Sequence, residues 1–242
     1  IMYSSLSDYM MFTLIFWRII FMTKIAVAID GPAAAGKSTI AKLVAKELGF
    51  TYIDTGAMYR CVTWYALSLG VNCQDEAKVC ELVSSCHINL APDGHVFCND
   101  VDVTHEIRTP EVAANVSYVA SYKDVRLHLV KLQRAMAEKV SVVMDGRDIG
   151  TYVLPNAEVK IFQIASIHTR AIRRFEENIS KGIICELADI EEELKKRDYI
   201  DSHRDFAPLK PAEDSIEIDT SDMNIEQVTQ KVIAIIKEKI GE

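Results

Sequence analysis

Short apolar runs alternate with amphipathic stretches along most of the chain, and this alternation predicts its fold. Strands are predicted at 24–29, 50–54, 142–148, 159–164 and 215–219. The first, third and fourth read as buried parallel strands, whereas the last alternates apolar and polar residues as an edge strand does. Amphipathic helices separate them, including a closing helix that begins with a capping-box-like pair, Asn224 and Gln227. The order predicts an α/β fold with a five-stranded parallel sheet flanked by helices.

Residues 71–110 interrupt this order. The segments 87–90, 95–98 and 101–103 are short and apolar, and they are separated by a Pro92-Asp93-Gly94 turn and a two-residue turn at 99–100. They predict a three-stranded antiparallel ribbon, inserted locally into the parallel arrangement. A helical stretch from Thr109 follows, with a break around 121–123 before it continues from 125 to 140.

The first predicted strand runs directly into a glycine-rich loop and a helix. Residues 31–38, Gly-Pro-Ala-Ala-Ala-Gly-Lys-Ser, fit the phosphate-loop pattern G-x4-G-K-[ST] in the context that this pattern requires. Backbone N–H groups of such a loop bind an anion at the positive end of the helix dipole. The loop therefore predicts an ATP site formed by Gly31, Pro32, Ala33, Ala34, Ala35, Gly36, Lys37, Ser38 and Thr39. Lys37 would neutralise phosphate oxygens, and the Ser38 hydroxyl would be a Mg²⁺ ligand.

Two groups of charged residues have helical spacing between 168 and 210. Arg170, Arg173 and Arg174 crowd one helical face with like charge, and Arg197, Asp201 and Arg204 fall at i, i+4 and i+7. Lys181-Gly182 between them is a plausible hinge. A solvated helix pair with internal salt bridges is one interpretation, but beside a phosphate loop an anionic ligand is favoured.

Composition narrows the possible functions. The chain has 242 residues and a net charge of −8, which argues against a general nucleic-acid binder. Its six cysteines form no C-x-x-C pair and have no histidines at zinc-site spacing. We expect reduced, mostly buried thiols, with no metal or redox role, in a cytoplasmic protein.

Residues 1–21 are interpreted separately. The segment 9–22 is apolar, but it is shorter than a bilayer span and carries Arg18 near its middle. We expect Met22-Thr23-Lys24 to be the natural start and residues 1–21 to be an extension outside the fold. A membrane-anchoring helix is the alternative.

A phosphate loop without an obvious guanine-reading motif or a large ATPase body suggests a small kinase. Several further motifs resemble the bacterial cytidylate kinases, in register from about Met22 to the C-terminus. They are Asp54-Thr-Gly-Ala-Met-Tyr-Arg60, Glu106-Ile-Arg-Thr, Asp145-Gly-Arg-Asp-Ile-Gly-Thr151, Arg170-Ala-Ile-Arg-Arg174 and Arg197-Asp-Tyr-Ile-Asp-Ser-His-Arg204. This combination is far more specific than the phosphate loop alone.

The resemblance implies transfer of the γ-phosphoryl group of ATP to CMP or dCMP, with Mg²⁺. It implies that Ser117, Arg126 and Asp148 hold the cytosine and that Thr55, Tyr59 and Arg60 line the monophosphate site. By the same resemblance Arg147 and Arg204 contact that phosphate, and Arg197 and Asp201 contact the sugar. We expect Lys37, Arg170, Arg173 and Arg174 to be the catalytic cations. Asp145 is a second candidate for organising magnesium, through water, although an Asp at a strand end is also a common turn cap.

The resemblance also implies a division of the chain. We expect a core at 22–70 and 141–242, a nucleoside-monophosphate-binding insert at about 71–140 and a lid at about 168–205. A monomer that binds small-molecule nucleotides, and neither nucleic acid nor membrane, is expected. Two alternatives stay open: another small phosphate-loop kinase acting on UMP, AMP or a non-nucleotide metabolite, and a non-catalytic ATP-binding switch or membrane-tethered adaptor.

Overall fold

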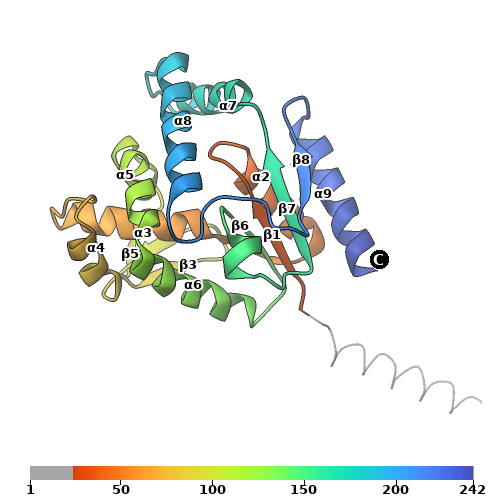
Figure 1. The fold of residues 1–242 in the computed structure, drawn as a ribbon, viewed down its shortest axis with the longest axis horizontal. Helices are drawn as coiled ribbons and strands as arrows, with labels where there is room; N and C mark the ends of the chain where they lie inside the picture. The colour runs from red at the N-terminus through yellow and green to blue at the C-terminus, as the bar shows by residue number, and fades with distance from the viewer. Residues whose placement is uncertain (1–23, 242) are drawn as a thin grey trace, which may run out of the picture.

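The computed structural model describes residues 24–241, which are built around a five-stranded sheet of order β2-β6-β1-β7-β8 (Figure 1). Its strands are β1 (Ala26–Asp30), β2 (Thr51–Asp54), β6 (Val142–Gly146), β7 (Val159–Ile164) and β8 (Ile216–Asp219). Every neighbouring pair is parallel. The predicted fold class is confirmed, and β8 lies at the edge of the sheet as its alternating pattern predicted.

Helices cover both faces of this sheet. On one face α2 (Lys37–Leu48) and α9 (Ile225–Ile240) pack on β1, β7 and β8 through residues such as Val44, Ile161 and Ile236. The other face is covered by α6 (Lys123–Ala137) and a π-helical turn, Ile149–Val153. Asn224 and Gln227 form the predicted capping box of α9. The sheet is thus buried on both faces, which explains why its inner strands are apolar runs.

A second apolar cluster lies beside the sheet. It is formed by α3 (Thr55–Ser68), α4 (Glu76–Val83), α5 (Pro110–Ser121) and the antiparallel sheet of β3 (Ile88–Leu90), β4 (Val96–Cys98) and β5 (Val101–Asp102). A short 3₁₀ helix, Glu106–Arg108, leads into α5. The predicted ribbon is confirmed, and Asn99 and Asp100 both have the positive φ that a tight two-residue hairpin turn requires.

Helix α4 was not predicted from the sequence. Asp75 caps it by accepting a hydrogen bond from the Lys78 N–H, and only Val79 and Val83 are buried. Eight residues with two buried positions give too little periodicity to be recognised, so packing against the neighbouring cluster decides this helix.

Two long helices, α7 (Ile167–Ser180) and α8 (Leu187–His203), follow β7 and project from the carboxyl end of the sheet (Figure 1). The two helices pack against each other. Gly182, with φ of 71°, lies just after α7, where the hinge was predicted. These two helices carry both of the charged groups noted in the sequence, except that Arg204 is the residue directly after α8.

None of the helices within residues 24–241 is long and apolar enough to cross a membrane. The apolar segment 9–22 lies outside the described residues. All six cysteines are free, and Cys61, Cys73, Cys86 and Cys98 are buried, as expected.

Candidate active site

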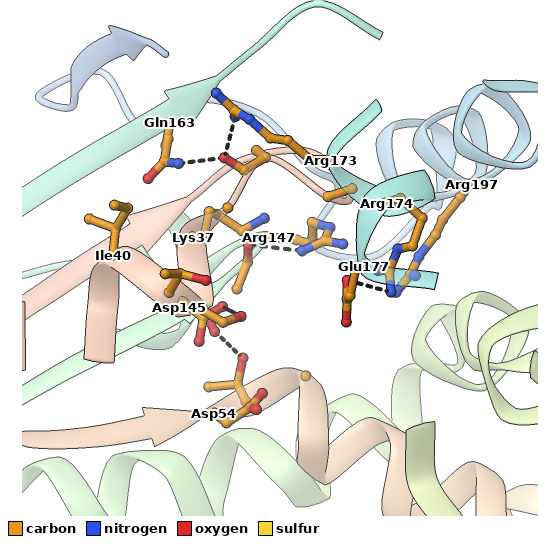
Figure 2. A pocket seen from close by; sticks show the side chains of 18 of the residues that line it. Lys37, Ile40, Asp54, Asp145, Arg147, Gln163, Arg173, Arg174, Glu177 and Arg197 are labelled. Carbon is orange, nitrogen blue, oxygen red and sulfur yellow. Dashed lines mark hydrogen bonds and ion pairs between the residues drawn. The ribbon is translucent and has the colours of Figure 1, made fainter. Parts of the chain in front are cut away.

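A cleft of about 1080 Å³ lies at the carboxyl ends of the strands, between the phosphate loop, the helices α7 and α8 of the predicted lid, and helices α3 and α5. Figure 2 shows Lys37, Arg147, Arg173, Arg174 and Arg197 approaching it from the loop, the sheet and the lid. It is where ligands bind in open α/β sheets.

The phosphate loop is held in a compact conformation. Gly36 (φ 88°) and Ala34 (φ 58°) both occupy left-handed backbone geometry. Gly31 (φ 150°) passes so close to β7 that an added Cβ would lie 2.0 Å from the Gln163 carbonyl oxygen. This requires glycine at 31 for steric reasons alone.

Lys37 begins α2 and is almost completely buried. Its ammonium donates to the Pro32 carbonyl oxygen at 2.7 Å. Burial, followed by repulsion from Arg147, lowers the pKa of Lys37 well below its usual value. A bound phosphate would oppose both effects, so the site favours an anion beside this lysine.

Asp145, at the end of β6, is held by three neighbours. Its carboxylate accepts hydrogen bonds from the Ser38 and Tyr52 hydroxyls, each at 2.7 Å, and its carbonyl oxygen accepts one from Thr55 Oγ1 at 2.6 Å. Burial raises the pKa of Asp145. Oxygen atoms of Ser38 and Asp145 therefore lie together at the N-terminus of α2.

Several guanidinium groups converge on the middle of the cleft. Arg147 Nε donates to Asp201 Oδ2 at 2.9 Å. Burial lowers the pKa of Arg197 to about 10 and that of Arg60 to about 9, with further repulsion from neighbouring arginines. Arg147, Arg197 and Arg204 instead hold the pKa of Asp201 below its usual value, although burial acts in the opposite direction. This concentration of buried positive charge is costly without an anionic ligand.

The end of the cleft opposite the loop is formed by a buried ionic network. Asp148 pairs with Arg126 through one oxygen and with Arg204 Nη2, at 3.2 Å, through the other. The hydroxyls of Ser117 and Tyr59 and the Nε of Arg126 are buried there, and each is without a hydrogen-bond partner among residues 24–241. Buried polar atoms without partners are unusual, and a ligand that hydrogen-bonds to these three would satisfy them.

The three arginines of α7 differ in whether their side chains reach the cleft. Arg173 donates to the Thr220 carbonyl oxygen at 2.6 Å and to the Ala35 carbonyl oxygen at 3.3 Å, and Arg174 pairs with Glu177 at 3.2 Å. Both line the cleft. Arg170, near the start of α7, is buried, and its donors are directed at Ala33, Ala165 and Asp198. The structure therefore does not bring Arg170 to the cleft surface with the other two.

The remaining sequence candidates are brought together. The cleft is lined by Ala34, Ala35, Gly36, Lys37, Ser38, Thr39, Thr55, Tyr59, Arg60, Ser117, Arg126, Asp145, Arg147, Asp148, Arg197, Asp201 and Arg204. The first three residues of the loop, Gly31, Pro32 and Ala33, do not line the cleft.

The sequences of known proteins match most of this chain. A family model described as cytidylate kinase matches residues 27–238. The chain belongs to the cytidylate kinase family. A cytidylate kinase of Bacillus licheniformis is 50% identical over 220 residues, which cover 89% of this chain and 97% of that protein. A cytidylate kinase of Leuconostoc mesenteroides is 51% identical over 223 residues, covering 91% and 100%, and one of Bacillus subtilis is 50% identical over 219 residues, covering 89% and 98%.

In this member of the cytidylate kinase family, four supporting residues were missed by sequence reasoning. Asp30 accepts hydrogen bonds from the N–H groups of Ile149 and Gly150, each at 2.8 Å, and so ties the loop's strand to the turn after Asp148. Gln163 donates to the Ala35 carbonyl oxygen at 2.5 Å. Tyr52 and Asp198 are the other two. Each acts across a long sequence separation, so no local pattern could have identified it.

Proposed function

We propose that this protein transfers the γ-phosphoryl group of ATP to CMP or dCMP, which gives ADP and CDP or dCDP. The observation that supports this most directly is the pairing, within one cleft, of a phosphate loop with the buried network of Asp148, Arg126 and Arg204. The name of the relatives, cytidylate kinase, agrees with it.

The donor phosphates would bind the loop from Gly31 to Thr39 at the N-terminus of α2. The N-terminus of α2 and the buried Lys37 ammonium would supply the positive charge. Arg173 and Arg174 approach from the lid, where they would neutralise charge that spreads over the transferred group.

The acceptor would lie with its base toward Asp148. A carboxylate oxygen accepts a hydrogen bond from an exocyclic amine, and Arg126 and Ser117 donate to ring carbonyl and nitrogen atoms. Thr55, Tyr59, Arg60, Arg147 and Arg204 would surround the monophosphate, and Arg197 and Asp201 the sugar. The unpaired Ser117 and Tyr59 hydroxyls and the unpaired Arg126 Nε support this orientation.

Ser38 and Asp145 fit a Mg²⁺ ion, with Asp145 acting through water. Both offer oxygen atoms, and Mg²⁺ in kinases takes only one or two protein ligands and completes its shell with water and phosphate oxygens. Within residues 24–241 no cluster of three His, Cys, Asp or Glu side chains could hold a metal alone. When bound, the ion would supply charge neutralisation at the β- and γ-phosphates.

In the reaction an oxygen of the acceptor phosphate forms a bond to the γ-phosphorus as the bond to the β–γ bridging oxygen breaks. The residues of this chain align the two oxygens and neutralise charge, because phosphoryl transfer needs positioning more than covalent chemistry. The lid over the cleft would exclude water, which competes as the acceptor.

The deciding experiment measures ADP release from ATP and magnesium with CMP, dCMP, UMP, AMP or no acceptor. We expect fast turnover with CMP and dCMP, and its loss in Asp148→Ala. Equal slow hydrolysis in every tube would instead favour an ATP-binding switch, and fastest turnover with UMP would favour a different pyrimidine kinase.

We further propose a cytoplasmic monomer in pyrimidine nucleotide metabolism, acting on nucleotides without a nucleic-acid or membrane partner. Six free thiols and a net charge of −8 support this. We also propose the division into a core (22–70 and 141–242), an acceptor-binding insert (about 71–140) and a lid (about 168–205), with residues 1–21 outside it. Light scattering after size exclusion tests the oligomeric state.

A further inference from the structure

One residue of the phosphate loop, Ala33, has both of its backbone polar groups bound by side chains of α7 and α8. The Ala33 N–H donates to Asp198 Oδ1 at 3.1 Å, and the Ala33 carbonyl oxygen accepts from Arg170 Nη1 at 2.9 Å. Arg170 Nη1 also lies 2.7 Å from Asp198 Oδ2, which closes the ring. The loop, α7 and α8 therefore meet in a single hydrogen-bonded unit.

This unit is largely shielded from solvent. The side chain of Arg170 is 5% exposed and that of Asp198 is 20% exposed. Around it Ala33 packs with Ala171, Ile190 and Leu194 in a small apolar cluster. Charge-assisted hydrogen bonds are strengthened in such surroundings, so the ring resists displacement of the loop from the lid helices.

The conformation of the loop depends on support of this kind. Ala34, the next residue, has φ of 58°, which costs a residue other than glycine roughly 1–2 kcal/mol. Such a conformation persists only where neighbouring groups fix it. Because the Ala33 N–H and the Ala33 carbonyl oxygen are both bound, the two peptide groups that flank Ala33 are held, and the chain enters Ala34 at a fixed orientation.

Arg170 and Asp198 are also close in sequence to the arginines of both lid helices. Arg173 and Arg174 follow Arg170 by three and four residues on α7, and Arg197 directly precedes Asp198 on α8. Holding Arg170 and Asp198 against the loop thus fixes where the cleft arginines stand relative to Lys37 (Figure 2). A shift of one helix would move its arginines away from the donor phosphates.

We propose that Asp198, acting with Arg170, is a positioning residue. The pair holds the phosphate loop and the lid arginines in the relative positions that phosphoryl transfer requires. Among the described residues that line the cleft, neither of the two is present, so both act through other groups. The inference rests on the proposed kinase function, and it changes the role expected for Arg170 from phosphate contact to support.

The test compares Asp198→Asn, Arg170→Lys and the double variant with a matched control. Glu191→Gln is that control, because Glu191 accepts from His168 at 2.8 Å and so joins the same two helices away from the loop. For each protein we would measure kcat, the KM for ATP and for CMP, the ATP dissociation constant by calorimetry, and thermal unfolding.

We expect Asp198→Asn to lower kcat/KM for ATP by about 10- to 100-fold, as misplacement of reacting groups does. The KM for CMP should stay within about twofold, because other residues form the acceptor end, and Glu191→Gln should behave as wild type. The double variant should lose little more than the worse single variant, as members of one unit do.

A purely structural role would lower the unfolding temperature but leave kcat and the ATP dissociation constant of the folded enzyme unchanged, and that result would overturn the inference. Failure of the proposed function is distinguishable. If the wild-type protein did not phosphorylate CMP, the proposed kinase function would be wrong. Unchanged ATP affinity in Asp198→Asn would, independently of that result, contradict the positioning role of Asp198 and Arg170.

Discussion

The Ser38 hydroxyl donates a hydrogen bond to Asp145 Oδ2 over 2.7 Å and joins the first turn of α2 to the end of β6. The two residues are 107 positions apart in the sequence. Tyr52 holds the second carboxylate oxygen of Asp145 at the same distance. The carboxylate is therefore held at the phosphate loop from two sides.

Asp145→Asn should raise the magnesium concentration needed for half-maximal activity and lower turnover by about 10- to 100-fold, because an amide carries no charge to attract the cation's water shell. Magnesium titrations of initial rate measure both effects. Asp100→Asn, in the exposed hairpin turn, is the matched control. Unchanged magnesium dependence in Asp145→Asn would assign Asp145 to capping alone.

Ser117→Ala tests the acceptor end without breaking an ion pair. The Ser117 hydroxyl is buried and has no hydrogen-bond partner among residues 24–241. Its removal should change the free energy of unfolding by less than about 1 kcal/mol, since no bond is lost. The KM for CMP should rise by about tenfold, because a ligand hydrogen bond disappears. An unaltered KM with CMP would place the base elsewhere.

Gly31→Ala should destabilise the fold strongly. The new Cβ would lie 2.0 Å from the Gln163 carbonyl oxygen, so the loop or β7 must shift. We expect a loss of about 2–4 kcal/mol in urea unfolding and weakened ATP binding.

Gly49→Ala is the control for this substitution. Gly49 also has positive φ (68°), but a Cβ there would meet no atom within 4 Å. Its cost should be only about 1 kcal/mol, from backbone strain alone. Equal losses in the two variants would mean that steric contact at Gly31 contributes nothing.

The buried carboxylate of Asp30 should make the free energy of unfolding depend on pH. Burial raises its pKa to about 7, although the N–H groups of Gly150 and Ile149 act in the opposite direction. Because the folded value lies above the ordinary value of 3.8, the stabilisation is fully present below about pH 4 and is lost as pH rises through about 7. The integrated effect is on the order of 4 kcal/mol.

Asp30→Asn removes this titration. Urea unfolding of both proteins between pH 5 and pH 8 should show the stability advantage of wild type over the variant shrinking as pH rises. Parallel curves for the two proteins would contradict a raised pKa at Asp30. Asp100→Asn, which removes an exposed carboxylate, should leave the wild-type pH profile intact.

Removing residues 1–21 should leave activity and solubility unchanged. The start of the described chain is anchored by its own contacts: the Ile25 N–H donates to Ser141 Oγ at 3.1 Å, and the Val142 N–H donates to the Ile25 carbonyl oxygen at 2.8 Å. Relatives matched over 97–100% of their length cover about 90% of this chain. Specific activity of the shortened protein on CMP decides the matter, and its loss would assign the segment a role.

Local sequence signals were sufficient where one element carries its own pattern. The loop 31–38, the Asn224–Gln227 capping box and the Asn99-Asp100 turn were each predictable, because a few adjacent residues specify their backbone geometry. The inner strands β1, β6 and β7 were predictable because strands buried on both faces must be largely apolar, and the edge strand β8 was predictable from its alternating pattern. The resemblance to a family placed most of the cleft residues.

Tertiary structure decided what depends on distant partners. The helix α4 has only two buried positions, so its neighbours fix it. Arg170 resembles Arg173 and Arg174 in sequence, yet it turns toward Ala33 and Asp198, because helical spacing does not say which side of a face meets the cleft. Thus the amino-acid sequence alone determined the fold class and the phosphate loop, through short-range backbone and burial rules. Only the packing of residues more than 100 positions apart decided which charged side chains line the cleft and which hold the loop in place.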